Sequence, residues 1–219
     1  MRVVVCFSGG LDSTVLVYKL VDEGHEVLPL AFDYGQRHSR ELSSAFEICK
    51  RKKLDLVIYK VEFPAGNLVA GFRDTQAEPL VGSATVVPCR NLVFLTMGAA
   101  YAYSQAADAV AMAAHAGDHA VYADCRTPFL VAVEHLIRAT YGDTIKFLAP
   151  FLAMSKAEIV TLGQTLKVPF SETWSCYAGL AMPCGTCGAC IERSNALGDY
   201  WNQGMTFAKR HPPRTVTHL

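Results

Sequence analysis

Predicted buried strands alternate with predicted helices along the chain, and this alternation restricts the fold more than any other feature of the sequence. Val, Ile and aromatic side chains favour strands, whereas apolar residues with a period near 3.6 favour helices. The expected elements, in chain order, are residues 3–7, 15–20, 26–32, 40–53, 56–61, 91–107, 109–113, 129–139 and 156–166. Parallel strands joined through helices bury both faces of their sheet. The sequence therefore predicts an α/β fold with a parallel sheet covered by helices on both faces.

A long segment between two of these elements has no sustained hydrophobic period. Residues 63–87 mix glycine, proline and polar side chains, so they are expected to form a loop. Loops of this length in compact enzymes often serve as lids or substrate-binding segments. Residues 200–219 carry no readable signal.

The composition indicates a compact enzyme that acts on small molecules. The chain has 219 residues and is 51% hydrophobic, which is enough for a buried core. Lys plus Arg and Asp plus Glu each total 20, so the chain has no surplus positive charge that could bind the phosphate backbone of nucleic acids. Direct binding of nucleic acid is therefore not expected. A few local charges still suffice for a small anionic substrate.

The sequence predicts a cytoplasmic protein with reduced thiols. Only five apolar residues, 3–7, follow Met1 and Arg2 before a polar glycine turn, so no secretory signal is expected. Polar residues interrupt the most apolar long stretch, residues 98–116, which predicts a buried helix and strand and no membrane span. Eight cysteines in a cytoplasmic chain of this length do not form a disulfide framework, so clustered ones are expected to bind metal.

A glycine-rich loop connects the first predicted strand to the first predicted helix. Its sequence is Ser8-Gly9-Gly10-Leu11-Asp12-Ser13-Thr14. Phosphate is the expected occupant, because glycines let the backbone approach a ligand and unpaired N–H groups at a helix start bind anions. Asp12 is interpreted as a Mg²⁺ ligand, since hard cations prefer oxygen and bridge to phosphates. An ordinary strand-to-helix turn with an Asp or Ser cap is the alternative.

The string Ser-Gly-Gly-x-Asp-Ser-Thr after an amino-terminal apolar strand resembles the loop of the N-type ATP pyrophosphatases, the PP-loop superfamily. The resemblance implies a Rossmann-like, adenine nucleotide α-hydrolase-like fold. It also implies that ATP is cleaved between the α and β phosphates, and that a substrate atom is adenylated and then displaced. The residues expected to bind ATP are Phe7, Ser8, Gly9, Gly10, Leu11, Asp12, Ser13, Thr14 and Arg37.

Four cysteines toward the carboxyl end have the spacing of a metal site. Seven residues separate the first two, and two residues separate each later pair, which is typical of tight loops around one tetrahedral ion. The predicted ligands are Cys176, Cys184, Cys187 and Cys190. One Zn²⁺ is expected, and four thiolates fill its shell, so the ion should be structural. An iron–sulfur cluster is the alternative.

Strings along nearly the whole chain resemble the 7-cyano-7-deazaguanine synthase family, which makes the preQ0 base. They are residues 8–14, 32–38, 87–91, 94–95 and 122–126, Pro150, Lys156, and residues 175–177 leading into the cysteine cluster. By this resemblance ATP adenylates 7-carboxy-7-deazaguanine, ammonia displaces AMP to give the amide, and a second activation dehydrates the amide to the nitrile. A carboxylate conjugated with an electron-rich pyrrole is a poor electrophile, so activation is needed chemically. The family also suggests a homodimer.

The chain is accordingly divided into a PP-loop ATP pyrophosphatase domain and a zinc-binding segment that packs on the same domain. The expected bounds are residues 1–170 for the domain and residues 171–219 for the segment.

Charged and polar residues within the matching strings are the candidates for the site. Four cations could neutralise the triphosphate, the leaving pyrophosphate and the substrate carboxylate, although each could also be a surface charge. These cations are Arg37, Arg90, Arg126 and Lys156. The predicted catalytic residues are Asp12, Arg90 and Lys156. The predicted substrate-binding residues are Asn91, Phe94, His115, Asp118, Tyr122, Asp124 and Arg126.

Structural roles compete with several of these assignments. Asn91 could cap the following helix as well as bind a base edge. Phe94 and Tyr122 could stack on a flat deazapurine or belong to the core. His115 could transfer protons or simply be a hydrogen-bonded loop residue.

Departures from the family pattern leave the final product open. Cys89 stands where glycine is frequent in the family, Ala123 stands where proline is frequent, and residues 114–120 differ from the most familiar members. The enzyme could therefore stop at the amide. A separate alternative is a relative that attaches a deazaguanine to a partner protein. A further alternative is adenylation of RNA bases, which zero net charge argues against.

Overall fold

A five-stranded parallel sheet forms the centre of the computed structural model, which describes residues 1–63 and 85–198. The strand order is β3-β2-β1-β4-β5. The strands are β1 (Arg2–Cys6), β2 (Glu26–Asp33), β3 (Val57–Lys60), β4 (Ala109–Ala111) and β5 (Lys146–Leu148). The predicted α/β fold with a parallel sheet is confirmed.

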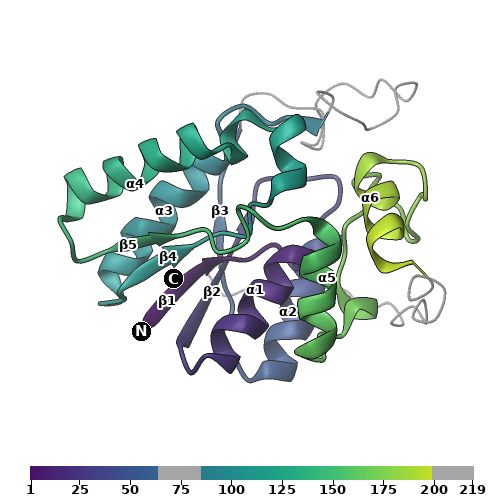
Figure 1. The fold of residues 1–219 in the computed structure, drawn as a ribbon, viewed down its shortest axis with the longest axis horizontal. Helices are drawn as coiled ribbons and strands as arrows, with labels where there is room; N and C mark the ends of the chain where they lie inside the picture. Colours follow the sequence, from purple (N-terminus) through teal and green to yellow (C-terminus); the bar gives the residue numbers. More distant parts are fainter. Residues whose placement is uncertain (64–84, 199–219) are drawn as a thin grey trace.

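Helices cover both faces of this sheet, as Figure 1 shows. One face carries α1 (Leu11–Asp22), α2 (Arg40–Lys52) and α5 (Lys156–Thr165), and the other carries α3 (Arg90–Ser104) and α4 (Thr127–Tyr141). The last described helix, α6 (Gly188–Leu197), packs against α5. Three short 3-10 helices are η2 (Ala116–Ala120), η3 (Ala123–Cys125) and η4 (Phe170–Glu172).

The central strand β1 contributes to two hydrophobic cores. Val3 and Val5 belong to the core beneath α1, α2 and α5, whereas Val4 belongs to the core beneath α3 and α4. Successive side chains of a strand point to opposite faces, so all three valines are buried. β1 has β2 and then β3 on one side and β4 and then β5 on the other, so the direction in which strands are added reverses at β1. Ligands in open α/β sheets bind at such a reversal of strand order, so the loops after β1 and β4 are where a site is expected.

The second strand contains a proline without losing a ladder hydrogen bond. Pro29 pairs with Val5 in register, and the next residue, Leu30, accepts a bond from the Phe7 N–H at 2.8 Å. Polar backbone groups of a strand alternate in direction, so the nitrogen of Pro29 faces the β3 side. Pairing between β2 and β3 begins only at Leu30. The missing N–H of Pro29 therefore lies beyond the ladder.

Besides the three short 3-10 helices, one strand and one α-helix were not predicted from the sequence. β5 has only three residues and none of them is fully buried, so its hydrophobic pattern is weak. α6 begins inside the cysteine cluster, where glycine and cysteine obscure a helical period. Of the predicted loop at residues 63–87, residues 64–84 lie outside the described residues, as does the tail from residue 199.

Cys89 adopts a left-handed conformation, with a φ of 57°, where it precedes α3. Side chains with a Cβ are strained in this region and glycine is not. The glycine that is frequent here in the family therefore suits the backbone. We expect Cys89→Gly to stabilise the protein by about 1 kcal/mol, measured by urea unfolding. Cys89→Ala keeps the Cβ and should give no such gain. A Cys89→Gly protein no more stable than Cys89→Ala would contradict this explanation.

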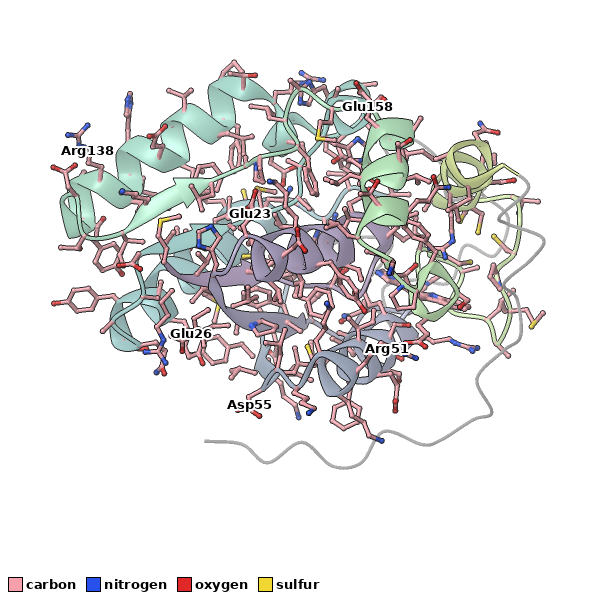
Figure 2. The ribbon with its side chains drawn as sticks, turned by 60° about the horizontal axis from the view of Figure 1, so that its bottom comes forward. Glu23, Glu26, Arg51, Asp55, Arg138 and Glu158 are labelled. Atoms are coloured by element: carbon pink, nitrogen blue, oxygen red, sulfur yellow. The ribbon has the colours of Figure 1, made fainter. Side chains whose placement is uncertain are left out.

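Charged residues line the outside of the fold. Figure 2 labels Arg51 of α2, Arg138 of α4 and Glu158 of α5, and all three side chains are exposed. Glu158 closes a capping box, because it accepts the Ser155 N–H at 2.7 Å and Ser155 Oγ accepts the Glu158 N–H at 3.3 Å. Among the described residues, no helix is long and apolar enough to cross a membrane.

Candidate active site and metal centre

The glycine-rich loop lies at the carboxyl end of β1 and leads directly into α1. Gly9 has a φ of 78°, and a Cβ there would collide with the backbone of α2 at Glu41 and Ala45. Both the conformation and the close approach therefore require glycine. Gly10 caps α1 without a side-chain hydrogen bond, so the first N–H groups of the helix have no cap from this residue. Such N–H groups form a site for an anion.

Hydroxyl groups hold the loop in shape from within. Ser8 Oγ accepts the Gly10 N–H at 3.1 Å and lies 3.1 Å from Ser13 Oγ. Thr14 Oγ1 donates to the Gly10 carbonyl oxygen at 2.7 Å and is buried. Ser13 Oγ also donates to the Gly10 carbonyl oxygen, at 3.3 Å, so the loop backbone accepts from the hydroxyls of both Ser13 and Thr14.

Lys156 lies in front of the loop, between two carboxylates. Its Nζ donates to Asp12 Oδ2 at 2.8 Å and to Glu192 Oε2 at 2.9 Å. Burial would lower the pKa of Lys156, but the charges of Asp12 and Glu192 outweigh burial and raise it. Lys156 is therefore a cation at neutral pH. The second oxygen of Asp12, Oδ1, is buried and has no hydrogen-bond partner within the described residues.

His115 and Asp118 follow β4 and reach the same cluster. His115 is buried, and its Nδ1 accepts the Gly117 N–H at 3.0 Å, so the ring proton is on Nε2. His115 Nε2 lies 3.6 Å from Asp118 Oδ1 and 3.9 Å from Asp12 Oδ2. Burial raises the pKa of Asp118, and the positive charge of Lys156 opposes the rise. These two predicted substrate-binding residues are therefore found beside the glycine-rich loop.

Arg90 lies in a second group of residues, among tyrosine hydroxyls. Its Nη1 donates to Tyr34 Oη at 3.3 Å. The hydroxyls of Tyr122 and Tyr177 lie 3.4 Å apart, and Tyr122 also pairs with Thr85 at 2.6 Å. Within residues 1–63 and 85–198, Arg90 forms no salt bridge with a carboxylate. A guanidinium without a carboxylate partner in a largely buried place is suited to binding an anionic ligand.

A buried polar network connects this tyrosine group to the loop. His38 Nε2 lies 3.4 Å from both Tyr34 Oη and Glu41 Oε2, and Gln36 Nε2 donates to Glu41 Oε1 at 2.9 Å. Burial lowers the pKa of His38 to about 3 and raises the pKa of Glu41 to about 7. The backbone of Glu41 also faces Gly9. The network therefore supports both the loop and the tyrosine beneath Arg90.

Other predicted substrate-binding residues are engaged with the protein itself. The side-chain amide of Asn91 donates to the Asp124 carbonyl oxygen at 3.2 Å, and this contact joins α3 to η3. Phe94 stacks on Phe32 with ring centroids 4.1 Å apart. Arg126 is exposed, and its Nε donates to the His119 carbonyl oxygen at 2.8 Å. In this structure Asn91, Phe94 and Arg126 thus make contacts with neighbouring elements of the protein.

The four predicted cysteine ligands converge. Their sulfur atoms all lie within 4.8 Å of one another, and Cys184 and Cys190 are 4.0 Å apart. Backbone N–H groups point at the sulfurs, including that of Cys187 to Cys184 Sγ at 3.3 Å. A tetrahedral ion with bonds of about 2.3 Å separates its sulfur ligands by about 3.8 Å. The donor set and spacing therefore form a four-cysteine metal site.

The segment that carries these cysteines also borders the loop. The Trp174 N–H donates to the Gly9 carbonyl oxygen at 3.0 Å, and the Trp174 indole donates to the Cys176 carbonyl oxygen at 2.9 Å. Two more residues of this segment belong to the groups described above. Glu192 lies in the group around Lys156, and Tyr177 lies in the group around Arg90. Sequence reasoning missed both residues. Tyr177 lies in one of the stretches that resemble the family, but no role was predicted for it. No sequence signal links Glu192 to Lys156.

Two solved structures share the fold. The U34-tRNA thiolase NcsA from Methanococcus maripaludis, solved with its [4Fe-4S] cluster, has a TM-score of 0.52 and 14% identity over 94% of this chain and 68% of its own. The NMN synthetase from Francisella tularensis has a TM-score of 0.50 and 19% identity over 95% of this chain and 79% of its own. At these identities the likeness concerns the fold alone.

Sequence relatives are much more similar. The 7-cyano-7-deazaguanine synthase of Pseudoalteromonas translucida is 37% identical over 90% of this chain and 93% of its own length. The synthases of Methanoregula boonei and Rhizobium leguminosarum bv. trifolii are 38% and 40% identical, over 90% of this chain and 94% and 87% of their own lengths. The family model described as Queuosine biosynthesis protein QueC matches residues 2–201. The chain belongs to this family, the ATP-dependent 7-cyano-7-deazaguanine synthases.

Proposed function

We propose that this chain converts 7-carboxy-7-deazaguanine and ammonia to 7-cyano-7-deazaguanine at the expense of two ATP molecules. The first ATP adenylates the carboxylate and releases pyrophosphate, and ammonia then displaces AMP to give the amide. The second ATP adenylates the amide oxygen, and loss of AMP and a proton leaves the nitrile. The observation that carries this proposal is the loop with Asp12 and Lys156 paired in front of it, in a chain of this family.

The loop and its neighbours are suited to hold ATP phosphates. The N–H groups at the start of α1 and the hydroxyls of Ser8 and Ser13 would contact the β and γ phosphates, and Lys156 would neutralise the leaving pyrophosphate. Asp12 would hold Mg²⁺ through Oδ1, whose lack of a partner in the described part of the chain fits an external ligand. A bound Mg²⁺ supplies positive charge where pyrophosphate departs.

Arg90 is proposed to receive the carboxylate of 7-carboxy-7-deazaguanine. It lacks a carboxylate partner in the described residues, and a planar fork of N–H donors matches a planar carboxylate. Tyr34, Tyr122 and Tyr177 surround it with hydroxyls and ring faces that suit a flat, polar base. Asp124 and Arg126 are proposed to bind the substrate and Arg37 to bind ATP; these roles rest on the family resemblance.

The metal in the four-cysteine site is proposed to be one structural Zn²⁺. Sulfur atoms within 4.8 Å fit the edges of a single tetrahedral ion. An iron–sulfur cluster has several metal atoms and would hold its thiolates farther apart. Four thiolates leave no open position on the ion, so its part is to hold the segment in place.

Three broader expectations also remain proposals. A homodimer follows from the family resemblance, and a cytoplasmic location follows from the reduced thiols that a four-cysteine site needs. The division of the chain at residue 170 is the third. Trp174 and α6 pack directly on the loop and on α5, so the segment after residue 170 is expected to unfold together with the rest.

The product distinguishes the proposed function from an enzyme that stops at the amide. Supplied 7-amido-7-deazaguanine should be converted with ATP to the nitrile, followed by mass spectrometry. The reason is that a neutral amide must be retained by contacts to the deazaguanine ring, and the tyrosine group around Arg90 offers such contacts. Phe94 is less suited to this role than the sequence indicates, because Phe32 already covers one face of its ring.

Controls for this experiment separate the alternatives. The acid with ATP and ammonia should release AMP when no macromolecule is present, which excludes RNA or a partner protein as the acceptor. If the acid is converted to the amide but supplied amide is never consumed, the chain stops after one activation.

A further inference from the structure

Glu192 comes from the helix that the metal site organises, yet its carboxylate lies in the ATP site. It stands on α6, two residues after the ligand Cys190. Its Oε2 accepts from Lys156 Nζ at 2.9 Å, and its Oε1 lies 3.9 Å from His115 Nε2. The next residue, Arg193, is buried and donates to Thr173 Oγ1 at 2.7 Å, which fixes the orientation of α6. Glu192 is therefore held in place by the fold.

The hydrogen bonds of Lys156 show what this carboxylate does. An ammonium group has three N–H donors. Asp12 takes one at 2.8 Å and Glu192 takes another at 2.9 Å. His115 Nε2 lies 3.3 Å from Lys156 Nζ but carries its own proton, because Nδ1 accepts the Gly117 N–H. Within residues 1–63 and 85–198, one donor of Lys156 is therefore left over, and the two bonds to carboxylates determine its direction.

We propose that Glu192 is a positioning residue that orients Lys156 toward the phosphates of ATP. The inference rests on the proposed function, in which Lys156 neutralises departing pyrophosphate. Asp12 would share its carboxylate between Lys156, through Oδ2, and the metal that accompanies ATP, through Oδ1. Glu192 gives Lys156 a second carboxylate that is not shared with that ion. A long lysine side chain that is already oriented loses less conformational entropy when it meets the phosphate.

The experiment measures AMP formation by the full-length protein with 7-carboxy-7-deazaguanine, ammonia and varied ATP. Glu192→Ala should lower kcat by about tenfold or more and change KM for ATP by less than about threefold, since the lost interaction acts on the departing pyrophosphate. Glu192→Gln keeps an acceptor without the charge and should fall between the two proteins. Glu134→Gln, the same substitution at an exposed position of α4, is the matched control and should leave kcat unchanged.

A double-mutant cycle separates this role from a structural one. In a Lys156→Met background, Glu192→Ala should change kcat by less than about twofold, because Glu192 then has no lysine to orient. An undiminished effect in that background, or a near-normal kcat for Glu192→Ala alone, would overturn the inference. A Lys156→Met protein with normal kcat would instead overturn the proposed role of Lys156 and this inference with it. Thermal unfolding and zinc content of each variant show whether the fold and the metal site are kept. If Glu192→Ala does not fold, Glu192→Gln tests the inference, because it preserves the side-chain volume.

Discussion

Replacing Asp12 with asparagine is expected to reduce kcat by about 100-fold or more, with the fold intact. Asparagine keeps the shape of the side chain but loses the charge that would hold the metal beside the leaving pyrophosphate. The loss also removes one of the two carboxylates that hold Lys156. Stability should change little, because Asp12 Oδ1 has no partner among the described residues and Lys156 keeps its bond to Glu192. Steady-state AMP release measures the effect.

Asp22→Asn is the matched control for this variant. Asp22 stands at the other end of the same helix, α1, and is exposed, so the same change of charge should leave turnover unaltered. Circular dichroism should give identical spectra for both variants and the parent. Near-normal AMP production by the Asp12→Asn protein would show that Asp12 only begins the helix and is no metal ligand.

Replacing Cys187 with serine is expected to abolish tight metal binding and to lower the free energy of unfolding by at least about 3 kcal/mol. For a chain of this size that loss corresponds to a melting temperature lower by about 10 °C. Cys187 is buried, and its sulfur is one of four within 4.8 Å of one another. Serine is a poor ligand for zinc, so the metal no longer couples its binding to the folding of this segment. Calorimetry and metal analysis of the purified protein measure both effects.

Cys89→Ser serves as the comparison, because Cys89 is an exposed cysteine outside the cluster. It should retain one zinc per chain and a normal melting temperature. A chelator should destabilise the parent and Cys89→Ser proteins but have little further effect on Cys187→Ser. Absence of zinc from the parent protein, or full stability of a metal-free Cys187→Ser protein, would refute the structural role.

Local sequence patterns were sufficient to predict the glycine-rich loop and the cysteine cluster. Residues 8–14 follow a buried strand directly and begin a helix, so signals along the chain locate the loop, whereas the close approach of α2 to Gly9 depends on tertiary packing. The four cysteines lie within 15 residues, from Cys176 to Cys190, and their spacing alone brings the sulfurs together. Most strands and helices were found for the same reason, since hydrophobic periodicity is a local property.

Tertiary structure alone decided which side chains surround these features. Asp12, Lys156 and Glu192 come from three helices, and no periodicity states how those helices dock. The sequence left open whether Phe94 stacks on the substrate or belongs to the core, and only the tertiary structure places Phe32 of β2 against one face of its ring. Sequence patterns indicate which face of an element is buried, whereas contacts between distant segments depend on the angle and register at which buried faces meet. The site residues that were missed, which include Tyr34, Tyr177 and Glu192, depend on those long-range contacts.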